Sequence, residues 1–232
     1  MHLIKALIAE FLGTFALIFI GAGAVTVLDP PNIAAIALAH GFVIMAFAYA
    51  FGNESNSYLN PALTLGVVIA GEGRIGAALP VFLAQFAGGA IGGLALAAIY
   101  GVDAPHSLGM TTVTTSLTSV TGGLVLEGIG TFFLMTIVLN TALRGVAGKF
   151  APFAIGMTVA FCIMSFGAVT GASINPARTL GPAIGLGKFT EAVPYMLVQF
   201  LGAALAAIFY RFVFAKSIGD EKDTAVPDEP AF

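Results

Sequence analysis

Six long apolar stretches dominate this sequence. They run over about residues 4–28, 33–52, 78–101, 121–143, 151–169 and 192–214. A helix needs about 20 mainly apolar residues to cross the hydrocarbon core of a bilayer, and these stretches have about that length. Lipid offers no hydrogen-bond partner to exposed backbone groups, so a chain of this kind crosses the membrane as helices. The sequence therefore predicts an all-α membrane protein with six transmembrane helices.

The composition and the inventory of reactive side chains exclude several function classes. Hydrophobic residues make up 58% of the chain and charged residues 9%, against roughly a quarter charged in a soluble domain. Nothing resembles the basic surface that binds nucleic acid, so no nucleic-acid partner is expected. We find no nucleophile–base pair, no metal-ligand cluster and no phosphate-binding loop, which argues against an enzyme and against a metal site.

The basic residues predict the orientation in the membrane. An even number of spans places the following residues on one side: Lys5, Arg74, Arg144, Lys149, Arg211, Lys216 and Lys222. Cytoplasmic loops are enriched in Lys and Arg, so both termini should be cytoplasmic, with residues 215–232 as an acidic cytoplasmic tail. Lys188 is the one basic loop residue expected outside. Short loops and the lack of a transit signal favour a prokaryotic plasma (inner) membrane.

The two halves of the chain repeat each other. Three matches occur in the same order and at nearly one offset: Glu10–Phe15 with Glu127–Phe132, Asn60-Pro61-Ala62 with Asn175-Pro176-Ala177, and Gln85-Phe86 with Gln199-Phe200. Each half contains three spans, and because three is odd the second half must cross the membrane upside down. We therefore expect an inverted 3+3 repeat, with residues 1–118 as the first unit and 119–214 as the second.

Each half also contains a short apolar segment that begins at proline, at residues 61–70 and 176–186. Such paired interruptions in inverted halves indicate a site near the middle of the membrane. Asn60 and Asn175 are good N-caps, and proline suits the first helical position. Two half-helices should thus meet with their positive ends converging, which opposes cations and hydronium. The Asn amide groups can still donate to a passing water.

With these motifs the chain resembles the major intrinsic protein family, the aquaporins and glycerol facilitators. The resemblance covers about residues 3–214 and rests on LNPALT at 59–64, INPART at 174–179 and both Glu-x-x-Gly-Thr-Phe stretches. It implies an aquaporin-like fold, a homotetramer in membrane lipid with one pore per subunit, and no cofactor. The pore would be built around Asn60, Pro61, Ala62, Asn175, Pro176 and Ala177. We accordingly expect a passive, proton-excluding water channel.

The resemblance also implies a selectivity filter formed by His40, Ile163, Ala172 and Arg178. A cation at membrane depth is a functional residue by default, and in the family this Arg donates to solutes and repels cations. The filter is most similar to that of plant tonoplast intrinsic proteins. It predicts a pore somewhat wider than a strict water filter, which admits ammonia, urea or hydrogen peroxide. A packing role for His40 is the alternative.

Three further residues carry expectations from the same resemblance. Glu10 and Glu127 should accept hydrogen bonds from the loops that lead to the Asn-Pro-Ala motifs, with a proton relay as the alternative. Tyr58 replaces a family His and is a candidate for narrowing the cytoplasmic mouth. His106, in an outer loop, is expected to be solvated, with a contact to Arg178 as the alternative.

Other transport classes stay open at this point. A glycerol or small-polyol facilitator is the first alternative, although Thr179 stands where glycerol facilitators have Asp. An ion-coupled secondary transporter also uses inverted repeats, but it would need titratable groups at its site, and the candidates are Glu10, Glu127 and His40. A nonconducting membrane scaffold is the third. A linear, unsaturable flux would exclude the carrier, and a flux that depends on Arg178 would exclude the scaffold.

Overall fold

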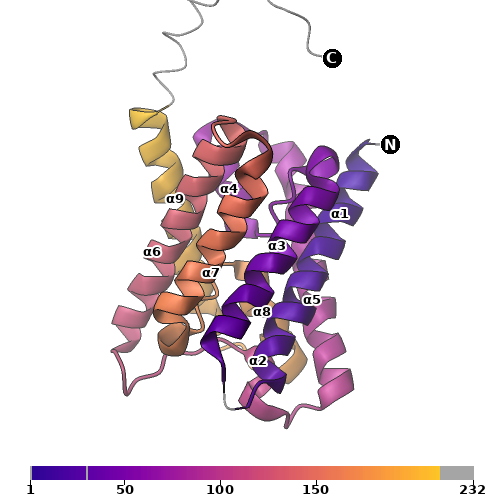
Figure 1. The fold of residues 1–232 in the computed structure, drawn as a ribbon, viewed down its shortest axis with the longest axis vertical. Coiled ribbons are helices and arrows are strands. Elements are labelled where there is room, and N and C mark those ends of the chain that lie inside the picture. The colour runs from indigo at the N-terminus through magenta and orange to yellow at the C-terminus, as the bar shows by residue number, and fades with distance from the viewer. Residues whose placement is uncertain (1, 30, 215–232) are drawn as a thin grey trace, which may run out of the picture.

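The computed structural model describes residues 2–29 and 31–214, and within them it contains helices and no strands. Six helical segments are long and apolar enough to cross a membrane: Leu3–Val27, Ile33–Ser55, Ile75–Tyr100, Val120–Leu143, Gly148–Thr170 and Ala192–Val213. They run alongside one another as a bundle (Figure 1). The six predicted spans and the all-α fold are confirmed. The expected acidic tail at 215–232 lies outside the described residues.

Each half of the chain contributes three spans and one half-helix. The first half comprises α1 (His2–Ala16), the π-helical η1 (Leu17–Ala22), α2 (Gly23–Val27), α3 (Ile33–Ser55), α4 (Pro61–Ala70) and α5 (Ile75–Tyr100). The second comprises α6 (Val120–Val138), the π-helical η3 (Leu139–Leu143), the 3₁₀ turn η4 (Gly148–Phe150), α7 (Ala151–Thr170), α8 (Pro176–Leu186) and α9 (Ala192–Val213). The connection between the halves contains the short η2 (Pro105–Gly109).

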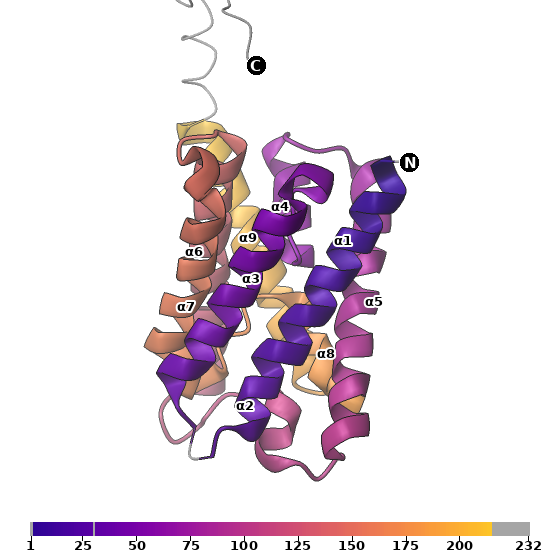
Figure 2. The same cartoon turned by 45° about the vertical axis from the view of Figure 1, so that its right-hand side comes forward.

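The half-helices α4 and α8 enter the bundle from opposite ends. In Figure 2, α4 lies in the half of the bundle where α1 begins and α9 ends, and α8 lies in the other half. We call the first the N-terminal end and the second the filter end. Helix contacts follow an inverted repeat, because α1 packs on α5 as α6 packs on α9, and α3 packs on its own counterpart α7. The half-helices have the bounds expected from the sequence.

Glycines bring α5 and α8 into backbone contact. A Cβ added to Gly89 would lie 2.7 Å from the carbonyl oxygen of Ala177, and one added to Gly185 would lie 2.5 Å from that of Gly93. At Gly93 the added carbon would overlap the carbonyl group of Gly181. Small residues permit such close approach of helices in lipid, where dispersion contacts hold them together. This contact fixes α8 against a full-length span.

We expect Gly93→Ala to lower the thermal unfolding midpoint of the detergent-solubilised protein. Forcing a methyl group between two backbones costs about 1–3 kcal/mol or more, because neither side can move without disturbing its helix. Gly76 lies in the same helix, where an added Cβ meets nothing within 4 Å. Gly76→Ala is therefore the matched control, and it should leave the midpoint unchanged or raise it slightly, since Ala favours helix. Equal midpoints for the two variants would contradict the close contact.

Candidate functional site: a pore at the meeting point of the half-helices

A cavity of about 20 Å³ lies where the two half-helices meet, which is room for about one water molecule. Its lining is built from pairs of residues that the inverted repeat relates, 115 or 117 positions apart. The pairs are Leu17 with Leu134, His40 with Ile155, Ile44 with Val159, Tyr58 with Ser173, Leu59 with Ile174, Asn60 with Asn175, and Leu63 with Arg178. Both halves of the chain therefore contribute equally to the wall of one pore.

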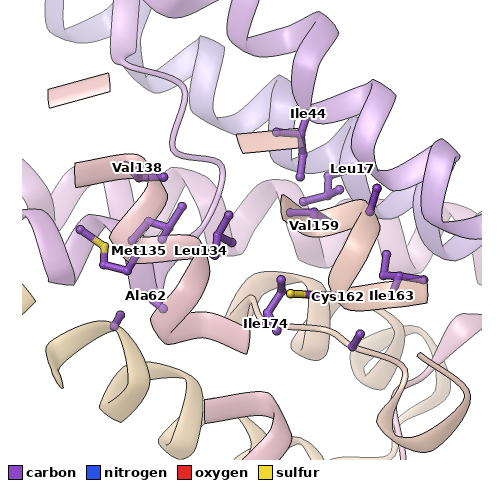
Figure 3. Close-up of a cluster of buried hydrophobic side chains, with 14 of the residues drawn as sticks. Leu17, Ile44, Ala62, Leu134, Met135, Val138, Val159, Cys162, Ile163 and Ile174 are labelled. Atoms are coloured by element: carbon purple, nitrogen blue, oxygen red, sulfur yellow. The ribbon is translucent and has the colours of Figure 1, made fainter. Parts of the chain in front are cut away.

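Most of these pairs are chemically alike, but three are not. His40, Ser173 and Arg178 stand at the filter end, and their counterparts at the N-terminal end are Ile155, Tyr58 and Leu63. Aliphatic side chains form another part of the wall: Figure 3 shows Leu17, Ile44 and Val159 lying together, from η1, α3 and α7. The lining of the central cavity thus combines this aliphatic part with the two Asn residues and with polar side chains at the filter end.

The Asn-Pro-Ala motifs begin the two half-helices. Asn60 caps α4 by accepting from the backbone N–H of Ala62 at 2.9 Å. Asn175 caps α8 in the same way, accepting from Ala177 N at 2.9 Å and from Arg178 N at 3.3 Å. Pro61 and Pro176 occupy the first helical position, where a missing N–H removes no helical hydrogen bond. Ala62 and Ala177, which complete the motifs, are fully buried.

The same two Asn side chains join the half-helices across the middle of the molecule. Asn60 Nδ2 donates to the carbonyl oxygen of Ile174 at 2.9 Å, and Asn175 Nδ2 donates to that of Leu59 at 2.8 Å. Each amide nitrogen carries two hydrogens, so one remains for a molecule in the cavity that both side chains line. The sequence predicted donation to water but gave no sign of these reciprocal bonds.

Glu127 holds the loop that leads into α8. Its Oε1 accepts from Ser173 N at 2.9 Å and from Thr170 Oγ1 at 2.7 Å, and its Oε2 accepts from Ile174 N at 2.8 Å and from Gln199 Nε2 at 2.9 Å. The carboxylate is completely buried, and all four of these partners are donors. Two of these bonds tie Glu127 directly to consecutive backbone N–H groups of the loop.

Glu10 does the same for the loop that leads into α4. Its Oε1 accepts from Tyr58 N at 2.9 Å, and its Oε2 accepts from Leu59 N and Gln85 Nε2, both at 2.8 Å. The glutamines Gln85 and Gln199 thus belong to the site. Gln85 and Gln199 occupy matching positions of the repeat. From that match their shared role, a hydrogen bond to the buried carboxylate of the same half, could have been inferred.

The supported loops adopt unusual backbone conformations at matching positions. Ser57 and Leu59 have φ values of 47° and 51°, and Ala172 and Ile174 have 43° and 44°. The left-handed region is rare for residues other than glycine and unfavourable for a β-branched residue such as Ile174. Such strain persists only where the surroundings impose it. The buried carboxylates supply that constraint, because each binds consecutive backbone N–H groups of its loop.

Arg178 lies between the central cavity and a larger one of about 450 Å³ at the filter end, since it lines both. The guanidinium is buried and its Nη1 donates to the carbonyl oxygen of Gly109 at 2.7 Å. Ile163 also lines the larger cavity. Ala172 is buried with its N–H bonded to Thr170 Oγ1 at 3.0 Å, and it belongs to the lining of neither cavity. The structure thus brings three of the four expected filter residues to the pore.

The imidazole of His40 has a hydrogen bond at one ring nitrogen and none at the other. Its Nδ1 donates to the carbonyl oxygen of Ile36 at 2.9 Å. Its buried Nε2 has no hydrogen-bond partner in the described residues. A neutral imidazole that donates through Nδ1 presents Nε2 as an acceptor. His40 and Arg178 both line the central cavity, and His40 Nε2 is left as an acceptor without a partner among the described residues.

Two other expected residues lie at the ends of the pore. Tyr58 lines the central cavity and also a cavity of about 280 Å³ at the N-terminal end, and its hydroxyl accepts from Asn56 Nδ2 at 3.3 Å. His106 lines the larger cavity at the filter end, and its Nε2 lies 3.8 Å from Asp29 Oδ1. Its nearby charged partner is thus Asp29, a pairing that the sequence did not indicate.

The family model described as "Major intrinsic protein" matches residues 1–210. "Probable aquaporin TIP2-2" of Oryza sativa subsp. japonica is 33% identical, covering 91% of this chain and 88% of its own. "Aquaporin AqpM" of Methanothermobacter marburgensis is 35% identical, covering 92% and 98%. The X-ray structure of the aquaglyceroporin from Plasmodium falciparum shares the fold, with a TM-score of 0.80, 24% identity and coverage of 94% and 99%. This chain belongs to the major intrinsic protein family.

Proposed function

We propose that the protein is a passive channel that conducts water and small neutral solutes and excludes protons and ions. One observation carries the proposal: a cavity wide enough for about one water is lined by both Asn60 and Asn175, with His40 and Arg178 at one end. These side chains provide hydrogen-bonding groups in a wall that is otherwise mainly aliphatic. Water exchanges hydrogen bonds at these few points and slides past the rest, which permits rapid conduction.

Ion exclusion follows from the fixed charges around the same cavity. The N-terminal ends of α4 and α8 meet at the cavity, and each carries a partial positive charge of roughly half a unit. Arg178 adds a full positive charge at the filter end. A cation or hydronium that enters must lose hydration in a region of positive potential, whereas neutral water meets no such barrier.

The solute range is proposed from the filter. His40 and Arg178 supply one polar side, and Ile163 supplies an apolar one. An aliphatic side chain at position 163, in place of a second imidazole, makes the filter wider. Ammonia, urea and hydrogen peroxide can then enter it and form hydrogen bonds along the polar side. Thr179, whose hydroxyl donates to Gln199 Oε1 at 3.3 Å, is engaged in supporting α8. It leaves no carboxylate there for a polyol, so glycerol is expected to pass poorly.

We also propose that the N-terminal end faces the cytoplasm and that the protein assembles as a homotetramer. Basic residues gather at that end, where Arg74 precedes α5, Arg144 follows η3 and Lys149 lies in η4. The tetramer rests on membership of the family and is tested by the molar mass of the purified protein in detergent. The central cavity is lined by residues of one chain, so each subunit would have its own pore.

Osmotic measurements test the function directly. Proteoliposomes should shrink in a sucrose gradient much faster than empty liposomes, and their flux should rise linearly with the gradient without saturation. Urea should enter the wild-type vesicles, and glycerol much more slowly. His40→Phe combined with Ile163→His should abolish urea entry and retain water flux, because an aromatic ring and a second imidazole fill the wider side. Wild-type water flux equal to that of empty liposomes would refute the channel, and saturable flux would indicate a carrier.

A further inference from the structure

Gly21 and the imidazole of His40 fit against each other at the filter end of the pore. Gly21 lies in the π-helical segment η1, on the span that packs beside α3. A Cβ built on Gly21 would lie 2.5 Å from Cδ2 and 2.6 Å from Nε2 of His40. Real Cβ atoms essentially never come within 3.0 Å of another heavy atom. The ring therefore occupies space that any residue other than glycine at position 21 would take.

The ring has one direction in which it can yield. Its Nδ1 edge is tied to the carbonyl oxygen of Ile36, one turn earlier in α3. The opposite edge, Cδ2 and Nε2, rests against Gly21. His40 is only 3% exposed, and with Leu17 it lines the central cavity. A side chain at position 21 would push the imidazole away from η1, and the open space beside the ring is the pore.

The inverted repeat supplies an internal comparison. The counterpart of Gly21, 117 residues later, is Val138, and the counterpart of His40, 115 residues later, is Ile155. Val138 is a buried side chain, so the N-terminal end has no glycine at this position. The π-helical segments differ too, since η1 covers Leu17–Ala22 and η3 covers Leu139–Leu143, five residues further along the repeat. Single π-helical turns are frequent at functional sites. Glycine and the π-turn thus coincide with the imidazole at the filter end.

We propose that Gly21 is a positioning residue that sets the width of the filter, by leaving room for the His40 ring to lie back from the pore. The proposal deepens the proposed channel function and rests on it. A larger residue at position 21 moves the ring into the path that urea and ammonia share with water. The permeability of urea then falls more than that of water, because urea is larger. Gly21 would thus determine selectivity without itself touching the solute.

The test compares the ratio of urea to water permeability in proteoliposomes. We expect Gly21→Ala to lower this ratio by about tenfold or more, the lower end of what one added methylene changes in a close-fitting site. Gly23→Ala is the matched control, because it lies on the same span and its added Cβ makes only an ordinary contact, 3.4 Å from Leu96 Cδ2. The control should keep the wild-type ratio. A wild-type ratio in Gly21→Ala would overturn the proposal.

The same substitution made in a His40→Ala variant distinguishes displacement of the His40 ring from general crowding of the helices around position 21. In His40→Ala there is no ring to displace, so adding Gly21→Ala should leave the ratio of that background unchanged. An equal fall of the ratio with and without His40 would refute the proposal. If Gly21→Ala alone does not fold, His40→Ala should restore a monodisperse protein, and failure to do so would also refute it. Wild-type vesicles that conduct nothing would instead count against the channel function.

Discussion

Arg178→Ala is expected to open the channel to cations while water still passes. The buried Arg178 lines both the central and the filter-end cavity, so a solute that crosses from one cavity to the other would pass beside it. A unit charge at 4 Å with an effective dielectric constant of about 20 repels a cation by about 4 kcal/mol. Removing even a third of this repulsion changes a rate about tenfold. The leak of cations or protons should therefore rise at least about tenfold.

The leak can be measured with a pH-sensitive dye trapped in vesicles that carry a potassium gradient. Arg178→Lys is the control, because it keeps the charge and gives up the fixed guanidinium that donates to Gly109 O. We expect it to exclude cations nearly as well as the wild type and to alter urea entry. A wild-type leak in Arg178→Ala would show that the converging half-helices exclude ions without this residue. Loss of all flux in the variant would instead indicate a structural role.

The sequence predicted the framework because its signals are local. Length and hydropathy mark a span, and Asn followed by Pro marks a helix start, so the half-helices Pro61–Ala70 and Pro176–Leu186 have the expected bounds. The ends of the spans were predicted less accurately. The second span was expected to end at residue 52, but α3 continues to Ser55. Hydropathy reports where lipid ends, whereas a helix continues until its backbone is capped, here by Asn56 in a left-handed conformation.

Features that depend on contacts between distant segments left no local trace. Nothing in the composition of residues 17–22 signals a π-helix, and the left-handed backbone at Leu59 and Ile174 runs against the preference of both residues. Ala172 was expected in the filter from the family resemblance; it is buried and has a left-handed backbone, which its sequence did not indicate. The repeat could have predicted more of the cavity lining, because its offset pairs every residue that lines the central cavity with another lining residue.

Glu127→Gln is expected to destabilise the protein strongly. Each carboxylate oxygen accepts from one backbone N–H, Ser173 N at Oε1 and Ile174 N at Oε2, so the new amide N–H₂ group faces a backbone donor whichever way it turns. A buried donor left without an acceptor costs about 1–3 kcal/mol. The thermal midpoint should fall, and water permeability should fall with it, because the loop that orients Asn175 loses its support.

Glu10→Gln provides the matched comparison, because Glu10 Oε1 likewise accepts from one backbone donor, Tyr58 N, and has a hydroxyl, that of Ser55, beside the carboxylate. Its midpoint should therefore fall by a similar amount to that of Glu127→Gln. A proton relay predicts the opposite pattern, since replacing a relay carboxylate by an isosteric amide spares the fold and changes proton flux. A stable Glu127→Gln that conducts water normally would contradict the support role. An unstable one that still excludes protons would show that these buried carboxylates hold the pore's backbone in shape and carry no protons through it.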